Sequence, residues 1–372
     1  MKTQFLLPLT LSVLLMSSVS DAAPLAHNAR SPVANKSTNT TSDSLPPLIS
    51  SRSKPASSIP KFDMKMEQII SEANGPLPPN TETKGPWALD LPKNATDEVS
   101  SFSAPAGVST ASTAQVATSF RRAELAANAY CRKVVPGNQW DCPHCQSSVN
   151  DAKIELTFTT VLDDTNGYVI TSKSQKTIFL VFRGTNSIRS AIVDMQFLKS
   201  SYPPVSGAEV HTGFYKSYVS VQKKILDTMG KLVTQYPDYS IDVSGHSLGA
   251  AQAVLATMDL FQRNNHITAS NTKIFTYGEP RIGNQNFAAY VKSTKIPHTR
   301  TVHASDIVPH LPPMAMGFLH SGTEYWIKDN KSKLTEICEA DFESEDCSNS
   351  AVPFLSIIDH LDYYGINEGL CL

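Results

Sequence analysis

The GHSLG motif at residues 245–249 constrains this chain more than any other stretch of its sequence. Before the motif, Ile241 and Val243 alternate with polar residues as in a half-buried strand, and after it apolar residues recur at helical spacing. A strand, a sharp turn that carries a serine and a helix together form a nucleophile elbow. The glycines suit a turn in which a Cβ would press on the neighbouring chain. The motif therefore predicts that Ser247 is a nucleophile at a helix N-terminus, whose free N–H groups face an oxyanion.

An elbow serine needs a base to take its proton and an acid to orient that base. In folds with this elbow the partners follow in the order Ser, Asp or Glu, His. The best acid is Asp306, which comes after a predicted strand at 299–303. His360, near the C-terminus, can return across the domain to Ser247. His310 lies only four residues after Asp306, which is awkward for an in-plane contact, so we interpret it as a hydrogen-bonded loop histidine.

The oxyanion needs two donors beside the serine. The N–H of Leu248 follows the nucleophile and is the first. We expect the second from the turn at 181–186, where Thr185 offers an N–H and a hydroxyl.

Asp359 is a second acid near the base, since it precedes His360 in sequence. Its side chain points away from that of His360 if the backbone there is extended or helical.

The first 22 residues have the pattern of a secretory signal peptide. Lys2 supplies a positive charge, residues 5–16 are apolar but too few to span a bilayer, and Ala22 ends a run of small residues. Since no later stretch is apolar for long enough, we expect a secreted, extracellular protein with no stable membrane insertion. Six cysteines, an even number, fit an oxidising compartment.

Residues 23–103 are rich in Ser, Thr, Pro and Asn, and such a segment buries too little apolar surface to fold by itself. A short amphipathic helix is predicted within residues 61–74, and sequons at Asn35, Asn39 and Asn94 suit an exposed secreted segment. The segment reads either as a disordered linker or as a propeptide that assists folding. The predicted boundaries are a propeptide at 23–103 and a catalytic domain at 104–372.

From Thr113 onward the pattern is that of a globular α/β domain with a central, mostly parallel sheet. The early strands lie close together in sequence, which predicts that part of the sheet is antiparallel. We interpret the pair Arg121-Arg122 as a solvated helix face rather than as a processing site. The predicted strands are 154–159, 167–171, 177–183, 240–244, 273–277 and 299–303, and the predicted helices are 114–131, 214–235 and 250–264.

The formal net charge of −2 and the lack of a basic patch argue against a nucleic-acid partner. No cluster of residues has metal-ligand spacing, so neither a metal nor an organic cofactor is expected. Cys142 and Cys145 match a C-x-x-C redox motif, but no thioredoxin-like βαβ pattern surrounds them. We interpret His246 and His211 as packing and hydrogen-bonding residues.

Many distinctive stretches between residues 126 and 372 resemble the filamentous-fungal triacylglycerol lipases of the Rhizopus and Rhizomucor type. They are AYCRKVVPGNQWDC, TNGYV, FRGTNSIRSAIVD, VSGHSLGAAQA, GEPRIGN, RTVHASDIVPHLPP, CSNSAVPFLSIIDHL and GINEGLCL.

The resemblance implies an α/β-hydrolase-type fold with a helical lid. It implies Ser247, Asp306 and His360 as the catalytic triad, and Thr185 and Leu248 as the oxyanion hole. It also implies the disulfides Cys131–Cys371, Cys142–Cys145 and Cys338–Cys347.

The segment 187–197 resembles the lid of that family. At helical spacing its apolar side chains share one face, and Arg189 lies on another; that face consists of Ile188, Ala191, Ile192 and Met195. By pattern alone the segment could be a core helix, but its place beside the oxyanion turn favours a lid. Exposing the apolar face to water costs ~25 cal/mol per Å². A lipid–water interface removes that cost, and this would produce interfacial activation.

Together these features predict a monomeric, secreted triacylglycerol lipase that hydrolyses long-chain acylglycerols through an acyl-enzyme. The alternative is a feruloyl-type or short-acyl carboxylesterase on the same fold. The apolar lid face favours the lipase, because a soluble ester needs no interface-sensitive cover. The candidate substrate-binding residues are Tyr130, Asp194, Phe214, Val308, Leu311, Pro312 and Leu361.

Overall fold

The computed structural model describes residues 45–49, 52, 107–160, 165–185, 197–340, 342–352 and 354–371. The chain divides between residues 44 and 45, and every described residue belongs to the second unit. The predicted signal peptide, the helix at 61–74, the sequons, the lid residues 188–195 and with them Asp194 lie outside the described residues.

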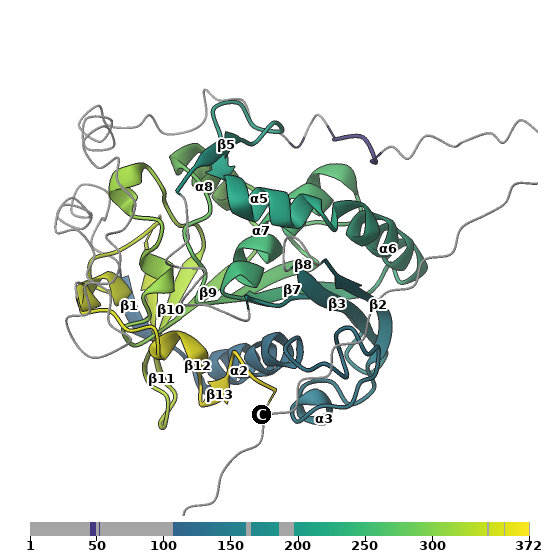
Figure 1. The fold of residues 1–372 in the computed structure, drawn as a ribbon, viewed down its shortest axis with the longest axis horizontal. Helices are drawn as coiled ribbons and strands as arrows, with labels where there is room; N and C mark the ends of the chain where they lie inside the picture. The colour runs from purple at the N-terminus through teal and green to yellow at the C-terminus, as the bar shows by residue number, and fades with distance from the viewer. Residues whose placement is uncertain are drawn as a thin grey trace, which may run out of the picture. The chain divides into compact units, whose positions relative to one another are not determined.

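Nine strands of the described chain form one mixed sheet, in the order β1-β11-β10-β9-β8-β7-β4-β3-β2 (Figure 1). The central strands from β10 to β4 run parallel, and antiparallel pairs complete both edges. The predicted α/β fold class is therefore confirmed. The strands of this sheet are β1 (Gly107–Thr110), β2 (Lys153–Thr159), β3 (Asn166–Ser172), β4 (Thr177–Phe182), β7 (Ser240–His246), β8 (Thr272–Tyr277), β9 (His298–His303), β10 (Thr323–Asp329) and β11 (Leu334–Glu339).

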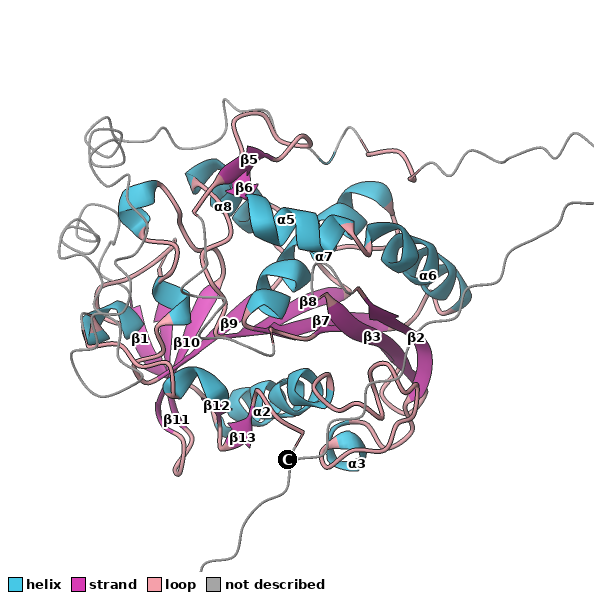
Figure 2. Ribbon diagram, viewed as in Figure 1, coloured by secondary structure: helices cyan, strands magenta, loops and turns pink. Residues whose placement is uncertain are grey.

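Helices cover both faces of the sheet (Figure 2). Helix α2 (Thr113–Asn128) and a small ribbon of β12 (Asp362–Tyr363) and β13 (Ile366–Asn367) lie on one face. The opposite face carries α5 (Thr212–Val219), α6 (Gln222–Gln235), α7 (Leu248–Arg263) and α8 (Gln285–Ser293). The remaining elements are α3 (Cys145–Ser148), β5 (Lys199–Ser201), β6 (Glu209–His211) and the short 3-10 helices η5 (Val308–His310), η6 (Met314–Met316), η7 (Ser348–Ala351) and η8 (Asp359–Leu361).

The alternation along β7 explains how the central strand is buried on both faces. Ile241 and Val243 join the largest core cluster together with apolar residues of α7. Asp242 points to the other face, where Nε of Arg122 on α2 donates to its Oδ2 over 2.7 Å. The prediction of a solvated Arg121-Arg122 pair thus holds only for Arg121, whose side chain is 47% exposed against 15% for Arg122.

The predicted helix 214–235 is interrupted between α5 and α6. Ser220 closes α5, and its hydroxyl donates to the carbonyl oxygen of Ser217 over 2.7 Å. A serine that bonds to the backbone in this way competes with the helical hydrogen bonds, which permits the break.

Disulfides join Cys131 to Cys371, Cys142 to Cys145 and Cys338 to Cys347, the pairs that the family resemblance implies. The first links the chain just after α2 to the C-terminal segment across 240 residues of sequence. In the described part of the chain, the helices are too short or too polar to cross a bilayer.

Candidate active site

The predicted elbow joins β7 directly to α7. Ser247 sits between them with φ 58° and ψ −129°, and α7 begins at Leu248. A Cβ at Gly245 would overlap the carbonyl of Gly249, and a Cβ at Gly249 would lie 2.6 Å from the carbonyl oxygen of Phe182 on β4. The steric reason for both glycines is therefore the close approach of the turn to its own helix and to the neighbouring strand.

Asp306 and His360 meet beneath this elbow. Asp306 follows β9, and His360 lies in η8 of the C-terminal segment. Nδ1 of the imidazole donates to Oδ2 of the carboxylate over 2.8 Å, and both side chains are fully buried. The hydroxyl of Tyr363 donates to the same Oδ2, and the N–H of Val308 donates to Oδ1 over 2.8 Å. The carboxylate is thus held from several sides in the orientation that an imidazole partner requires.

His246 connects the proposed base to the nucleophile, because it precedes Ser247 in sequence and its ring packs against that of His360. The ring of His246, the residue before Ser247, has its centroid 4.4 Å from that of His360. Nε2 of His360 is buried and has no hydrogen-bond partner among the described residues. In a serine triad this nitrogen takes the hydroxyl proton, and such bonds are often long until substrate is present. The structure therefore joins Asp306 to His360 and places the ring of His360 beside the residue that precedes Ser247.

The predicted oxyanion donors flank the serine. A Cβ at Gly184 would lie 2.8 Å from Cβ of Ser247, so the backbone that leads into Thr185 passes directly beside the nucleophile. Among the described residues no side chain caps the N-terminus of α7. The N–H of Ala250 donates to the carbonyl oxygen of Ser247 over 2.9 Å. The N–H of Leu248 stands at the first position of the helix, where it has no partner within the helix and can face a developing negative charge.

His246 makes two buried hydrogen bonds, in keeping with its predicted packing role. Its Nδ1 lies 2.7 Å from the hydroxyl of Tyr130, and its Nε2 lies 2.8 Å from the backbone carbonyl oxygen of His360. Burial lowers the pKa of His246 well below its usual value, and the charge of a protonated His360 lowers it further.

The other predicted substrate-binding residues lie in different surroundings. Val308 and Leu311 are buried in a small apolar cluster beside Asp306, and Leu361 packs against that cluster. Phe214 belongs to the main core and stacks on His211, with ring centroids 3.9 Å apart. The carbonyl oxygen of Pro312 accepts a hydrogen bond from Arg281.

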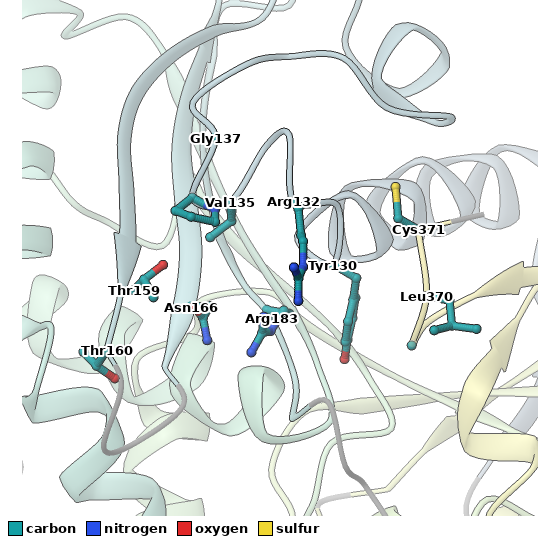
Figure 3. A pocket seen from close by; sticks show the side chains of 12 residues that line it. Tyr130, Arg132, Val135, Gly137, Thr159, Thr160, Asn166, Arg183, Leu370 and Cys371 are labelled. Atoms are coloured by element: carbon teal, nitrogen blue, oxygen red, sulfur yellow. The ribbon is translucent and has the colours of Figure 1, made fainter. Parts of the chain in front are cut away.

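A cavity of about 910 Å³ lies beside the chain that leads to Thr185 (Figure 3). The side chains of Tyr130, Arg132 and Arg183 point into it (Figure 3). Of the predicted substrate-binding residues, Tyr130 is the one found among its described lining. Arg132 and Arg183 make these sides of the cavity cationic, while Val135, Pro136 and Leu370 add apolar surface to its described lining. Its described lining consists of Tyr130, Arg132, Val135, Pro136, Gly137, Thr159, Thr160, Asn166, Arg183, Gly369, Leu370 and Cys371.

The sequence reasoning missed a buried ion pair that supports the loop after Asp306. Arg281 donates from Nε and Nη2 to the two carboxylate oxygens of Glu343, each over 2.8 Å. Its Nη1 donates to the carbonyl oxygen of His310 over 2.6 Å. His310 is hydrogen-bonded as predicted but ends the short 3-10 helix η5 rather than lying in a loop: its Nδ1 lies 3.1 Å from Oδ1 of Asn349, and burial together with the charge of Arg281 lowers its pKa to about 4. The signal for this pair was the arginine in the GEPRIGN stretch.

One group of possible metal ligands occurs in the described part of the chain, formed by Glu324, Cys338 and Cys347. Its two sulfur atoms are bonded to each other, so they cannot act as thiolate ligands. The group therefore does not fit a metal ion.

Comparison with known proteins gives consistent matches. Residues 179–316 match the family model described as lipase (class 3). A lipase of Rhizopus niveus is 50% identical over 346 residues, which are 88% of this chain and 88% of that protein. The solved Rhizomucor miehei lipase propeptide complex has a TM-score of 0.75 and 46% identity, covering 88% of this chain and all of the other. A structure titled as a serine protease triad forming the catalytic centre of a triacylglycerol lipase has a TM-score of 0.70 and 50% identity, over 72% and 100% of the two chains.

Proposed function

Because this chain belongs to the class 3 lipases, we propose that it is a triacylglycerol lipase that hydrolyses long-chain acylglycerols at a lipid–water interface. The observation that carries the proposal is the buried pair of Asp306 and His360 beside the elbow serine. An elbow serine alone indicates a hydrolase, whereas a serine with an oriented imidazole can perform acyl transfer.

The reaction uses this chain's own residues in two halves. Nε2 of His360 takes the proton of Ser247 as the hydroxyl oxygen attacks the ester carbonyl carbon. The N–H groups of Leu248 and Thr185 stabilise the oxyanion, and His360 then returns the proton to the departing glycerol oxygen. Water attacks the resulting acyl-enzyme by the same route and releases the fatty acid. Asp306 stays ionised and orients the imidazole, which carries the positive charge in each transition state.

The proposal of a lipase rather than an esterase for soluble substrates rests on the sequence at 187–197. A helix with Ile188, Ala191, Ile192 and Met195 on one face would cover the site in water and open at an oil surface, with Arg189 on another face. In the open form Asp194 would lie near the oxyanion hole. Val308, Leu311 and Leu361 would supply apolar wall for the acyl chain.

The N-terminal segments suit a secreted enzyme made as a precursor. We propose that residues 1–22 are a signal peptide, that 23–103 are a propeptide, and that the mature enzyme is an extracellular monomer. The support for the propeptide lies in Arg52, whose Nη1 donates to the carbonyl oxygens of Phe261 and Ile267 over 2.6 Å each. Its guanidinium also lies 4.4 Å from the ring centroid of Phe261. The segment thus contacts the C-terminal end of the helix that begins beside Ser247.

Two rate measurements test the function. The rate on tributyrin is followed as the substrate passes its solubility limit, and the rate on emulsified long-chain triglyceride is compared with that on a soluble aryl ester. A jump in rate at the solubility limit is expected. A smooth saturation curve with faster aryl ester turnover would instead favour the short-acyl or feruloyl-type esterase.

The nucleophile is tested by Ser247→Ala, with Ser244→Ala as its matched control. The control variant also removes a serine hydroxyl, three residues earlier in the chain. The Oγ of Ser244 faces the α2 side of the sheet, where it donates to the carbonyl oxygen of Arg122. Ser247→Ala should abolish hydrolysis of every ester, whereas Ser244→Ala should retain turnover. Turnover retained by folded Ser247→Ala would refute the triad.

A further inference from the structure

We propose that Tyr130 and His246 are positioning residues for the catalytic base: Tyr130 fixes the tautomer of His246, and His246 holds the backbone and the ring of His360. The inference rests on the proposed triad. It assigns Tyr130 a different task from the substrate contact expected from the sequence.

The hydrogen bonds determine where the proton on His246 lies. The carbonyl oxygen of His360 can only accept, so Nε2 of His246, 2.8 Å away, must carry the hydrogen. A neutral imidazole protonated at Nε2 has a lone pair at Nδ1. The hydroxyl of Tyr130, 2.7 Å from Nδ1, therefore donates to it. One donor thus fixes the tautomer, and the tautomer in turn holds the backbone of His360.

The charge of His246 matters because of the distance between the two rings. His360 becomes an imidazolium in the transition state, and the two ring centroids lie 4.4 Å apart. A second positive charge at that distance would oppose the first. Burial lowers the pKa of His246, and the bond from Tyr130 occupies the one lone pair that could take a proton. Among the described residues, Tyr363 also packs against this ring, with centroids 5.9 Å apart, and its hydroxyl donates to Asp306.

Tyr130 also contacts the oxyanion side of the site. A Cβ placed on Gly184 would overlap the hydroxyl of Tyr130 and would lie 2.8 Å from the carbonyl oxygen of His246. The tyrosine is itself firmly anchored: it is 8% exposed, and the next residue, Cys131, is disulfide-bonded to Cys371. A single hydroxyl therefore touches the backbone that leads to Thr185 and the histidine that supports the base.

The test compares Tyr130→Phe with Tyr168→Phe. Each change removes one hydroxyl from a buried tyrosine, but the hydroxyl of Tyr168 donates to the carbonyl of Leu125, away from the triad. Rates on a soluble aryl ester are measured from pH 4 to 9 and normalised by titration with a serine-directed phosphonate. The titration removes any loss of folded enzyme from the comparison.

For Tyr130→Phe we expect kcat to fall about five- to tenfold, the cost of one hydrogen bond, with KM within about twofold of wild type. Since Nδ1 of His246 would then be free to take a proton, the acid limb of kcat/KM should move to higher pH. Tyr168→Phe should keep the wild-type kcat and pH profile. A raised KM at unchanged kcat would overturn the proposal and return Tyr130 to the substrate-binding residues.

The second link is tested by His246→Leu and His246→Gln. Leucine removes the donor to the carbonyl of His360, whereas the glutamine side chain can carry an N–H to about the same place. We expect His246→Gln to recover a large part of the kcat that His246→Leu loses. Equal rates in the two variants, or equal losses in Tyr130→Phe and Tyr168→Phe, would overturn the proposal. If the phosphonate does not titrate the wild-type enzyme at all, the proposed triad itself is wrong, which is a distinguishable result.

Discussion

Nδ1 of His360 donates to Oδ2 of Asp306 over 2.8 Å, although the two residues are 54 positions apart in the chain. Asp306 is delivered by the end of a parallel strand, where open α/β sheets collect functional groups. His360 comes from a C-terminal segment without long helices or strands, which the bond between Cys131 and Cys371 ties to the chain after α2. The catalytic pair therefore joins the sheet to the last part of the sequence.

The first prediction separates Asp306 from the acid next to His360 in sequence. Asp306→Asn should lower kcat on a soluble ester by about 10⁴-fold, because the amide no longer stabilises the imidazolium or holds its tautomer. Asp359→Asn is the control, since Oδ2 of Asp359 accepts from the N–H of Ser305 over 3.0 Å and does not face the imidazole. A larger loss in Asp359→Asn would mean that the acid has been misassigned.

The second prediction concerns the space around His360. A Cβ on Gly278 would lie 2.5 Å from Cε1 of its imidazole, whereas a Cβ on Gly365 would meet nothing within 4 Å. Both glycines have positive φ, 57° and 81°, so alanine strains the backbone in each. Gly278→Ala should lose at least about tenfold in kcat, equivalent to 1.4 kcal/mol, because the base is displaced. Gly365→Ala should lose stability but retain kcat per folded molecule. Equal kcat values for Gly278→Ala and Gly365→Ala would contradict this prediction, because they would mean that the imidazole accommodates the added Cβ without leaving its catalytic position.

The third prediction concerns the ion pair of Arg281 and Glu343, whose side chains are 3% and 2% exposed. Glu343→Gln should reduce the free energy of unfolding by about 3–5 kcal/mol, because an unpaired buried guanidinium remains. The control is Asp141→Asn, which breaks an ion pair whose side chains are 63% and 68% exposed and should cost at most about 1 kcal/mol. Urea unfolding of both variants at pH 7 measures the difference.

The same ion pair gives a pH dependence. Burial raises the pKa of Glu343, but the charge and hydrogen bonds of Arg281 outweigh it and bring the pKa well below its usual value. A carboxyl group with a lowered pKa in the folded state contributes stability above its unfolded pKa of about 4.3, and that contribution is lost as the pH falls toward the folded value. The difference in stability between wild type and Glu343→Gln should therefore shrink steadily below about pH 4.3. A difference in stability between the two proteins that stays constant down to pH 2 would contradict the assignment of this pH dependence to Glu343.

The fourth prediction tests the proposed propeptide through Arg52. Arg52→Ala in the full chain should lower the yield of folded enzyme, since it removes the bonds to the carbonyls of Phe261 and Ile267 at the end of α7. The specific activity of the enzyme that does fold should stay unchanged. Lys54→Ala, with the same change in net charge two residues later, is the control. Equal yields from both variants would leave the contact without a role in folding.

The local sequence pattern was enough to predict the elements in which apolar residues recur at a regular spacing. The alternation around Ile241, the glycines of the elbow and the apolar spacing after Ser247 predicted β7, the turn and α7, because each depends on neighbouring residues alone. The same reasoning missed β10, β11 and the edge strand β1, which together form one side of the sheet. It also joined α5 and α6, because a break made by the hydroxyl of Ser220 leaves the hydrophobic period intact.

The sequence by itself determined which chemical groups this protein carries and in what order: an elbow serine, then an acid at a strand end, then a histidine near the C-terminus. It also favoured His360 over the other histidines as the partner of Asp306, and the structure confirms that contact. Only the tertiary structure decided what surrounds the pair. Contacts such as those of Tyr363 with Asp306 and Tyr130 with His246 join residues 57 and 116 positions apart. No local period encodes such pairs, because they form only when the sheet and the C-terminal segment pack together.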